Sequence, residues 1–478
     1  MKSLFALTFM ILFSLNLWSQ EGYEIEIELL SYDKDTLFLA YYHGDSQFMQ
    51  DTTTISNGKF IFSGEEPLKP GMYMVVREER SFFQLLIDEN EMHFSMTADN
   101  EEVAPTVQLE NAPQNEAFFG YMTFLQNQRK EGDVLREQLE TAEGEEREEI
   151  EDKLRGLDQA VKDYQWDLVE KFEGDLLGAI IRANIDPEVP EFDGTDEEVR
   201  QKKFEYYKEH FFDNFDFNDE RLLRSPILST KFNQYIDQMT SRSPDSIAKS
   251  IDLMLSMMED SDRVFRFFLA NSLNKYAQSK IIGMDAVYVH LIDKYYATGK
   301  AWWVGEEQLE RIMENADRIR PTLIGKTAAD ITVEKRDGQR VRLHSLDYDY
   351  TILYFWRPDC GHCRRYTPQI VEFIKEFEEK GVGVVTICTK FTDDVESCWE
   401  YIDRTDGTDH FLNLVDPFHR SRFTQHFNVR TTPLIYVLDS DKKIISKRLS
   451  AQQLPEVLPV LMRGRDTAGQ LTDTTPGE

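Results

Sequence analysis

Two cysteines three positions apart, placed where a strand pattern gives way to a helical pattern, most constrain how this chain folds. The β-branched and aromatic run Thr351 to Phe355 precedes them, and helical periodicity continues after them to Glu379. Cys360 and Cys363 therefore fall on the first turn of a helix, where unpaired N–H groups and the helix dipole favour a thiolate over a thiol. Dithiol–disulfide exchange needs this placement, because one sulfur attacks a partner disulfide and the second resolves the mixed disulfide.

A zinc site is the alternative interpretation of a C-x-x-C pair, and a structural zinc ion needs four ligands. The remaining cysteines, Cys388 and Cys398, lie ten positions apart, and no second C-x-x-C or H-x-x-x-H follows them. The sequence therefore favours redox chemistry with no metal and no cofactor. Cys388 ends an apolar strand and Cys398 lies early in the next helix, so we interpret both as buried, inert thiols. A second disulfide between them is the alternative.

The N-terminus has the pattern of an export signal. Lys2 supplies the positive end, Leu4 to Leu17 the apolar stretch, and Ser19-Gln20 a small-residue cleavage point. The apolar stretch is shorter than the about 20 residues of a membrane-spanning helix, and no cysteine lies near the cleavage point to carry a lipid. We expect residues 1–19 to be a signal peptide and the mature protein to be periplasmic or secreted, with no stable membrane insertion. An uncleaved signal that acts as an anchor is the alternative.

The formal net charge of −33 argues against nucleic acid or an anionic membrane surface as a partner, because both would be repelled. The acidic residues are spread along the chain, with a dense run from Glu143 to Glu151. A solvated helix face is the interpretation of this run, since its spacing lacks the loop pattern of a calcium site.

The 478 residues are too many for one core, and we expect about three domains. Residues 20–105 are predicted to form a small antiparallel β domain, as a sheet or a sandwich. Tyr23 to Leu29 alternates with period two, and Asn57-Gly58 is typical of a hairpin turn. No ionisable cluster stands out there, so this domain is interpreted as a structural or docking module.

Residues 112–320 are predicted to form a helical domain with no readable chemistry. Two long amphipathic helices, Asn115 to Thr141 and Glu145 to Glu173, come first, and a break rich in proline and acid follows at 186–194. Six shorter helices are expected at 197–211, 229–241, 246–258, 262–279, 285–298 and 306–319.

Residues 321–465 alternate between strand and helix patterns, which predicts a mixed sheet with helices on both faces. The strands are expected at 331–335, 341–343, 351–355, 382–388, 413–415, 434–439 and 443–449, and the helices at 364–379, 394–403, 419–427 and 454–462. Residues 466–478 are expected to be a flexible polar tail. The predicted fold class is thus multidomain, with an N-terminal all-β module, a central all-α domain and a C-terminal α/β domain.

This last domain resembles the thioredoxin superfamily, and within it the exported TlpA/ResA-like thiol–disulfide oxidoreductases. The matching residues are Gly325, Asp337-Gly338, Phe355-Trp356, Cys360, Cys363, Pro368 and Thr432-Pro433. The order of a β module, a helical domain and this domain also looks like that of multidomain exported proteins of Bacteroidetes. The resemblance covers under a third of the chain, and it implies a thioredoxin-like fold for that part.

The resemblance also implies roles for individual residues. Cys360 is expected to be the attacking thiolate, Cys363 the resolving thiol and partner of Cys360 in a redox-active disulfide, and His362 the residue that tunes Cys360. Pro433 is expected to be a cis-proline that, with Thr432, holds the backbone of the substrate. Trp356 is placed at the same substrate-binding end, where we expect it to pack under the motif rather than to react.

The sequence departs from the family pattern at three points. Asp359 precedes the attacking cysteine and would oppose its ionisation, whereas His362, Arg364 and Arg365 would favour it. Tyr354 occupies the strand position where thioredoxins carry a buried acid, and the segment from Thr389 to Phe391 offers no carboxylate instead. This leaves open how Cys363 is deprotonated. A peroxiredoxin interpretation is poor because Arg357 stands where the peroxidatic motif has Thr.

We therefore predict an exported thiol–disulfide oxidoreductase that reduces, oxidises or isomerises disulfides of other proteins. Its expected partners are cysteine-containing exported proteins and a membrane-bound or small-thiol redox partner. The alternative is a partner-binding or chaperone-like exported protein in which the C-terminal domain is accessory.

Overall fold

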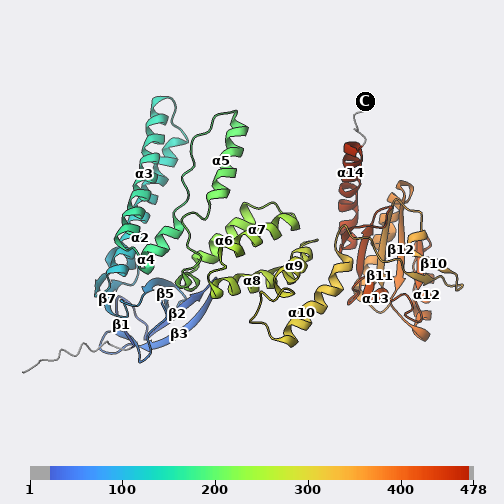
Figure 1. Ribbon diagram of the computed structural model, residues 1–478, viewed down its shortest axis with the longest axis horizontal. Coiled ribbons are helices and arrows are strands. Elements are labelled where there is room, and N and C mark those ends of the chain that lie inside the picture. The colour runs from blue at the N-terminus through green and yellow to red at the C-terminus, as the bar shows by residue number, and fades with distance from the viewer. Residues whose placement is uncertain (1–21, 473–478) are drawn as a thin grey trace, which may run out of the picture. The chain divides into compact units, whose positions relative to one another are not determined.

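The computed structural model describes residues 22–472, with side chains described up to residue 463. The expected signal peptide at 1–19 and the end of the expected tail, 473–478, lie outside the described residues. The chain divides into two compact units (Figure 1). The first unit extends to Thr240 and includes Ser256–Val264, and the second comprises Ser241–Leu255 and the chain from Phe265 onward. The domain boundaries that we drew from the sequence stay predictions.

The β part of the first unit consists of two four-stranded sheets, which confirms the all-β module. The strands are β1 (Tyr23–Leu30), β2 (Thr36–His43), β3 (Ser46–Thr54), β4 (Phe60–Gly64), β5 (Gly71–Arg77), β6 (Phe82–Ile87), β7 (His93–Asp99) and β8 (Gln108–Glu110). Their orders are β4-β1-β7-β8 and β3-β2-β5-β6. The expected turn is present, since Asn57 and Gly58 both have positive φ angles between the bridged residues Ser56 and Lys59.

The β domain was predicted to be antiparallel throughout. This prediction is wrong for one pair of strands, because β1 and β7 pair in parallel. Between β1 and β7 the chain forms β4 on the other side of β1 and the four strands of the second sheet, so no hairpin fixes the direction of β7. Strand β3 was missed. Its residues are mostly exposed, so the alternation that marks a half-buried strand is absent.

Helices make up the rest of the first unit. They are α1 (Val103–Thr106), α2 (Pro113–Leu139), α3 (Glu145–Lys171), α4 (Leu176–Asn184), α5 (Asp196–His210) and α6 (Ile227–Gln238). The two long predicted helices correspond to α2 and α3, and residues near their joined ends, among them Leu135 and Ile150, form a small apolar cluster. Sequence reasoning did not find α4, because this helix is buried on almost every side and has no polar stripe.

The second unit contains most of the residues of helices α7 to α10, together with the C-terminal domain. The helices are α7 (Pro244–Met257), α8 (Asp262–Ala277), α9 (Asp285–Leu291) and α10 (Glu306–Ile319). Helix α10 has the predicted bounds. The helix predicted at 285–298 is instead interrupted, since α9 continues into a π-helical turn over Ile292–Tyr296.

The C-terminal domain is built on a seven-stranded mixed sheet in the order β10-β9-β13-β12-β11-β14-β15. Its strands are β9 (Thr332–Glu334), β10 (Arg340–Arg342), β11 (Tyr350–Trp356), β12 (Val382–Cys388), β13 (Phe411–Val415), β14 (Leu434–Leu438) and β15 (Ile444–Lys447). The neighbours β11, β12 and β13 are parallel, and β14 runs antiparallel to β11. Both central strands, β11 and β12, are buried along their whole length. A sheet covered on both faces requires such continuous apolar strands.

Helices cover both faces of this sheet, as the sequence predicted. They are α11 (Gly361–Phe377), α12 (Glu396–Asp403), α13 (Phe423–His426) and α14 (Leu454–Thr472). Residues of α11, α12 and α14 form one buried cluster with the sheet, and Phe423 at the start of α13 belongs to the cluster on the opposite face. Within the described residues, no helix is both long enough and apolar enough to cross a membrane.

Candidate active site

The two cysteines of the C-x-x-C motif lie at the junction of β11 and α11. Cys360 is the residue directly before the helix, and its sulfur accepts a hydrogen bond from the backbone N–H of Cys363, with N and Sγ 3.2 Å apart. Both thiols are reduced in this structure. Cys360 is 8% exposed and Cys363 only 1%. The sequence-predicted pair is thus brought together, with one sulfur nearer the surface than the other.

The environment moves the pKa values of the two thiols in opposite directions. Burial acts to raise the pKa of Cys360, but hydrogen bonds from the side chain and N–H of Cys363, with contributions from Thr432 and the N–H of His362, outweigh it and lower the pKa below that of a free cysteine. Burial, followed by the hydrogen bond to Cys360, raises the pKa of Cys363 to about 11. As the pH rises, the sulfur of Cys360 therefore ionises before that of Cys363.

The loop before β14 faces the same sulfur. The peptide bond between Thr432 and Pro433 is cis, which confirms the expectation for Pro433. The thiol of Cys360 donates to the carbonyl oxygen of Thr432, at 3.3 Å. The substrate-binding roles of Thr432 and Pro433 stay predictions, but the loop does lie in contact with the attacking cysteine.

His362 is exposed, and its ring is engaged by a neighbour one turn further along α11. Its Nδ1 accepts a hydrogen bond from the guanidinium of Arg365, at 2.8 Å. Because arginine can only donate, Nδ1 is the acceptor in this arrangement. The influence of His362 on Cys360 seen here comes from its backbone N–H, so tuning by the imidazole stays a prediction.

Asp359, which we expected to oppose ionisation of Cys360, is matched by two cations. Its carboxylate lies 3.2 Å from the ammonium of Lys390 and 3.3 Å from the guanidinium of Arg357. Burial acts to raise the pKa of Asp359, but the hydrogen bond from Lys390 and the charge of Arg357 outweigh it and lower the pKa. The negative charge beside the attacking sulfur is therefore compensated locally.

Sequence reasoning missed Lys390. The segment from Thr389 to Phe391 was considered only as a source of a carboxylate, so the positive charge of Lys390 was overlooked. A signal was available in the order of the strands, because the ends of adjacent parallel strands meet at one edge of a sheet. Trp356 at the end of β11 pairs with Cys388 at the end of β12, so residues just after both strands come together.

Two buried aromatic residues lie beneath the motif. The hydroxyl of Tyr354 donates to the carbonyl oxygen of Cys363 at 3.3 Å, and burial raises the pKa of Tyr354 far above its ordinary value. It is therefore a neutral donor and no substitute for a buried acid. Trp356 is 3% exposed and its ring lies 5.1 Å from that of Tyr401, centroid to centroid. This burial agrees with the expectation that Trp356 packs under the motif.

The interpretation of Cys388 and Cys398 as inert thiols was wrong, because the structure joins them in a disulfide. Their Cα atoms lie 6.4 Å apart, inside the range that a disulfide can bridge. The segment after β12 turns back at once into α12, which returns Cys398 to the end of the strand. A separation of ten residues along the sequence does not reveal that return.

A C-x-x-C pair before a helix, faced by a cis-proline loop on a mixed sheet, defines the thioredoxin-like class. Residues 324–447 match the AhpC/TSA family, and this part of the chain is a thioredoxin-like domain of that family. The predicted resemblance is therefore confirmed. Residues 23–118 and 141–321 match two domains of unknown function, DUF4369 and DUF5106.

The relatives and the solved structure named below are each similar to part of the chain. A "Thioredoxin-like protein" of Haemophilus influenzae is 29% identical over 127 residues, which are 26% of this chain and 71% of that protein. "Thiol-disulfide oxidoreductase ResA" of Bacillus anthracis is 30% identical over 70 residues, 15% of this chain and 40% of that protein. Among solved structures, a thioredoxin-like protein from Bacteroides caccae has a TM-score of 0.44 at 18% identity, covering 58% of this chain and 98% of that one.

Proposed function

We propose that this protein is an exported thiol–disulfide oxidoreductase that exchanges disulfides with cysteines of other proteins. The observation that carries the proposal is the opposite shift of the pKa values of the two thiols. Cys360 has a lowered pKa at the start of α11, and Cys363 has a raised pKa one turn deeper. A reactive thiolate next to a protonated reserve thiol is the arrangement that two-step exchange requires.

In the reductive direction, the thiolate of Cys360 attacks one sulfur of a substrate disulfide. The substrate S–S bond breaks, a mixed disulfide forms, and the first substrate sulfur leaves as a thiolate that takes up a proton. Cys363 then loses its proton and attacks the sulfur of Cys360, which releases the second substrate thiol. Two electrons pass from the dithiol to the substrate, and the Cys360–Cys363 disulfide remains. Oxidation of a substrate dithiol is the reverse sequence.

The cis-proline loop supports a role in holding the substrate backbone. Thr431 and Thr432 lie at the surface or partly exposed, and their backbone N–H groups make no hydrogen bond with other residues in the described part of the chain. An extended segment of a substrate can pair with such groups as an added strand. Because Thr432 also contacts the sulfur of Cys360, pairing there would bring the substrate disulfide to the attacking atom.

Two features support an exported location and protein substrates. The signal-like pattern at residues 1–19 directs a chain out of the cytoplasm. The Cys388–Cys398 disulfide is of a kind that persists mainly in oxidising compartments. Substrates would then be cysteine-containing exported proteins, and electrons would be exchanged with a membrane-bound or small-thiol partner.

The test is the reduction potential of the Cys360–Cys363 pair, measured by equilibration with defined thiol–disulfide buffers and mass analysis of alkylated peptides. A value near about −270 mV indicates a reductant, and one between about −180 and −120 mV indicates an isomerase or oxidase. The matched control is the Cys388–Cys398 pair in the same samples. The proposal fails if Cys360 and Cys363 never form a disulfide, or if Cys360→Ser turns over a disulfide-linked peptide as fast as the unaltered protein.

A further inference from the structure

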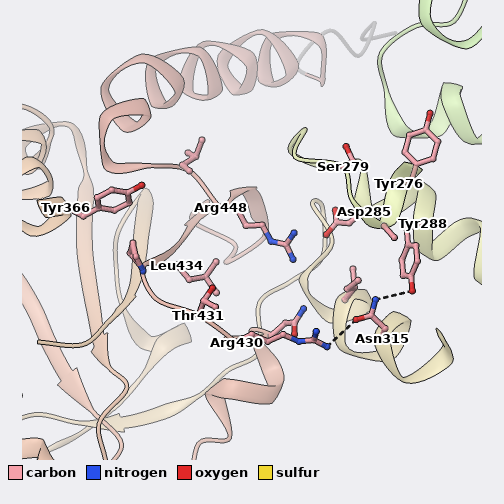
Figure 2. A pocket seen from close by; sticks show the side chains of 15 residues that line it. Tyr276, Ser279, Asp285, Tyr288, Asn315, Tyr366, Arg430, Thr431, Leu434 and Arg448 are labelled. Atoms are coloured by element: carbon pink, nitrogen blue, oxygen red, sulfur yellow. Dashed lines mark hydrogen bonds between the residues drawn. The ribbon is translucent and has the colours of Figure 1, made fainter. Parts of the chain in front are cut away.

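A cleft lies beside Pro433, within the second unit, and we call it the Pro433 cleft. Its volume is about 540 Å³, which is in the range of ligand-binding pockets. One side belongs to the thioredoxin-like domain and the other to helices α8, α9 and α10 (Figure 2). Its polar lining residues include Asp285, Tyr288, Asn315, Arg430, Thr431 and Arg448. The substrate loop of the proposed function is thus one edge of a much larger concave surface.

Specific contacts connect the two sides of the cleft. The ammonium of Lys447, on β15, lies 2.6 Å from the carboxylate of Asp285, the first residue of α9. Arg430 donates to the side-chain oxygen of Asn315 at 3.2 Å, and Asn315 in turn donates to the hydroxyl of Tyr288 at 3.0 Å. These contacts hold the helices against the thioredoxin-like domain and define the shape of the cleft.

The charges that face the cleft do not cancel. The carboxylate of Asp285 is paired with Lys447, whose side chain is 2% exposed. Arg430 donates a hydrogen bond to the neutral Asn315. Both Arg430 and Arg448 are exposed, and neither forms an ion pair with any residue that the structure describes. Figure 2 shows both arginines extending from the thioredoxin-like domain toward the helices that carry Asp285 and Asn315. In a chain of net charge −33, two uncompensated guanidinium groups next to Pro433 are a local attraction for anions.

The Oδ1 atom of Asp285 is buried and accepts no hydrogen bond from the described residues. Because this atom has almost no accessible surface, a ligand in the cleft would not reach it. Recognition would therefore rest on the two exposed guanidinium groups, which suit carboxylates.

We propose that the Pro433 cleft binds carboxylate groups that flank the disulfide of a substrate, and so selects acidic disulfide substrates. This inference rests on the proposed function, because it assigns the chemistry of the substrate to that same active site. Arg430 and Arg448 would bind the carboxylates, and the helices α8 to α10 would form the opposing surface. A carboxylate next to a disulfide can come from an acidic peptide segment or from a small anionic disulfide, and the experiment separates these two sources.

The experiment uses the full chain and disulfide-linked fluorescent peptides that differ only in having Asp, Asn or Lys beside the cysteine. We expect kcat/KM for the Asp peptide to exceed that for the Asn peptide by about tenfold, since two partly exposed charge pairs contribute. The double variant Arg430→Gln, Arg448→Gln should lose this preference, so that its kcat/KM values on the Asp and Asn peptides become equal. Arg404→Gln, an exposed arginine directly after α12 and outside the cleft, is the control for charge alone.

A second pair of substrates identifies the source of the carboxylate. Glutathione disulfide is compared with hydroxyethyl disulfide, which is small and uncharged. A preference for the Asp peptide that the double variant abolishes supports the inference with peptides as the source. A preference only for glutathione disulfide that the same variant abolishes supports it with small disulfides as the source. Equal rates on charged and neutral substrates, or a preference that the double variant retains, would overturn it.

A binding measurement keeps the inference separate from the proposed function. The same Asp and Asn peptides, with Ser in place of Cys, are titrated by fluorescence anisotropy, which needs no exchange chemistry. We expect the Asp peptide to bind about tenfold more tightly than the Asn peptide, and the double variant to remove the difference. Equal affinities for both peptides count against the cleft. Absence of turnover with every disulfide, together with selective binding, would instead refute the oxidoreductase and leave the site.

Discussion

The ion pair between Lys447 and Asp285 makes a quantitative prediction about the second unit. The ammonium of Lys447 contacts the Asp285 carboxylate and the carbonyl oxygen of Thr322, each at 2.6 Å. The two side chains are only 2% and 13% exposed. The pair joins the edge strand β15 to the start of α9, so it holds one side of the Pro433 cleft in place. We expect Asp285→Asn to weaken this connection strongly.

The magnitude follows from what the substitution leaves behind. Removing one partner of a buried ion pair costs about 3–5 kcal/mol, mainly because the other charge stays buried without compensation. The carbonyl of Thr322 still accepts from Lys447 after the change, and Asp285 retains some contact with solvent, which places the cost near the lower end, at about 3 kcal/mol. This corresponds to roughly two orders of magnitude in the equilibrium constant for opening.

Hydrogen exchange measured by mass spectrometry is the suitable assay, because a chain with two compact units need not unfold in a single transition. The amides of β15 and α9 should exchange roughly a hundredfold faster in Asp285→Asn than in the unaltered protein. Asp293→Asn serves as a matched control. Asp293 pairs with Arg320 near the surface, with side chains 50% and 31% exposed, so its loss should cost less than about 1 kcal/mol.

A double variant tests whether the unpaired charge causes the effect. Asp285→Asn combined with Lys447→Met removes both charges and keeps most of the lysine volume, so most of the protection should return. Asp285 also begins α9, where its interaction with the helix dipole is worth about 0.3–1 kcal/mol, and that smaller loss would persist. Unchanged exchange in Asp285→Asn, or a double variant as unstable as the single one, would refute the reasoning.

Three further predictions concern the active site. Cys360→Ser should abolish disulfide exchange, whereas Cys363→Ser should accumulate mixed disulfides with substrate on non-reducing gels; equal loss without trapped species in both variants would contradict the assigned order. The rate of alkylation of Cys360 should rise with pH and level off at a lower pH than for a free cysteine, because the pKa of Cys360 is lowered. Cys363, with a pKa of about 11, should react only in strong alkali. Similar pH profiles for both thiols would show that their environments do not differ. Lys390→Gln should slow alkylation of Cys360 severalfold at pH values below the pKa of Cys360, because Asp359 then loses a compensating charge. Lys375→Gln, on the far part of α11, is the control and should not slow it. Equal rates in both variants would rule out the role of Lys390.

Much of the fold could be predicted because local patterns and final packing agree. Helix α10 has an apolar stripe along one face, and its predicted bounds are those observed. The fully buried and mostly apolar strand β12 was likewise located from its sequence alone. The elements that were not predicted lack the contrast between one apolar and one polar face. Strand β3 is exposed on both faces, and α4 is buried on nearly all sides. Their structure is imposed by neighbours that are distant in sequence.

The candidate site divides in the same way. The positions of Cys360 and Cys363 follow from a local junction of strand and helix, and the cis-proline followed from a family resemblance at Pro433. The disulfide between Cys388 and Cys398 depends on how the chain turns back after β12. The sequence alone does not show that the chain turns back and brings Cys398 to Cys388. The preferred interpretation of these two cysteines as inert thiols was therefore wrong.

The pairing of β11 with β12 also explains how an acidic residue is tolerated beside the attacking thiol. Trp356 stands opposite Cys388 in the sheet, so the segment that follows Cys388 runs alongside the active-site turn. The N–H of Thr389 donates to the carbonyl of Trp356 at 2.8 Å, and the next residue, Lys390, reaches the carboxylate of Asp359. The disulfide fixes the start of this same segment. Compensation of Asp359 is thus a property of strand register, and a search confined to the residues around the C-x-x-C motif could not have found it.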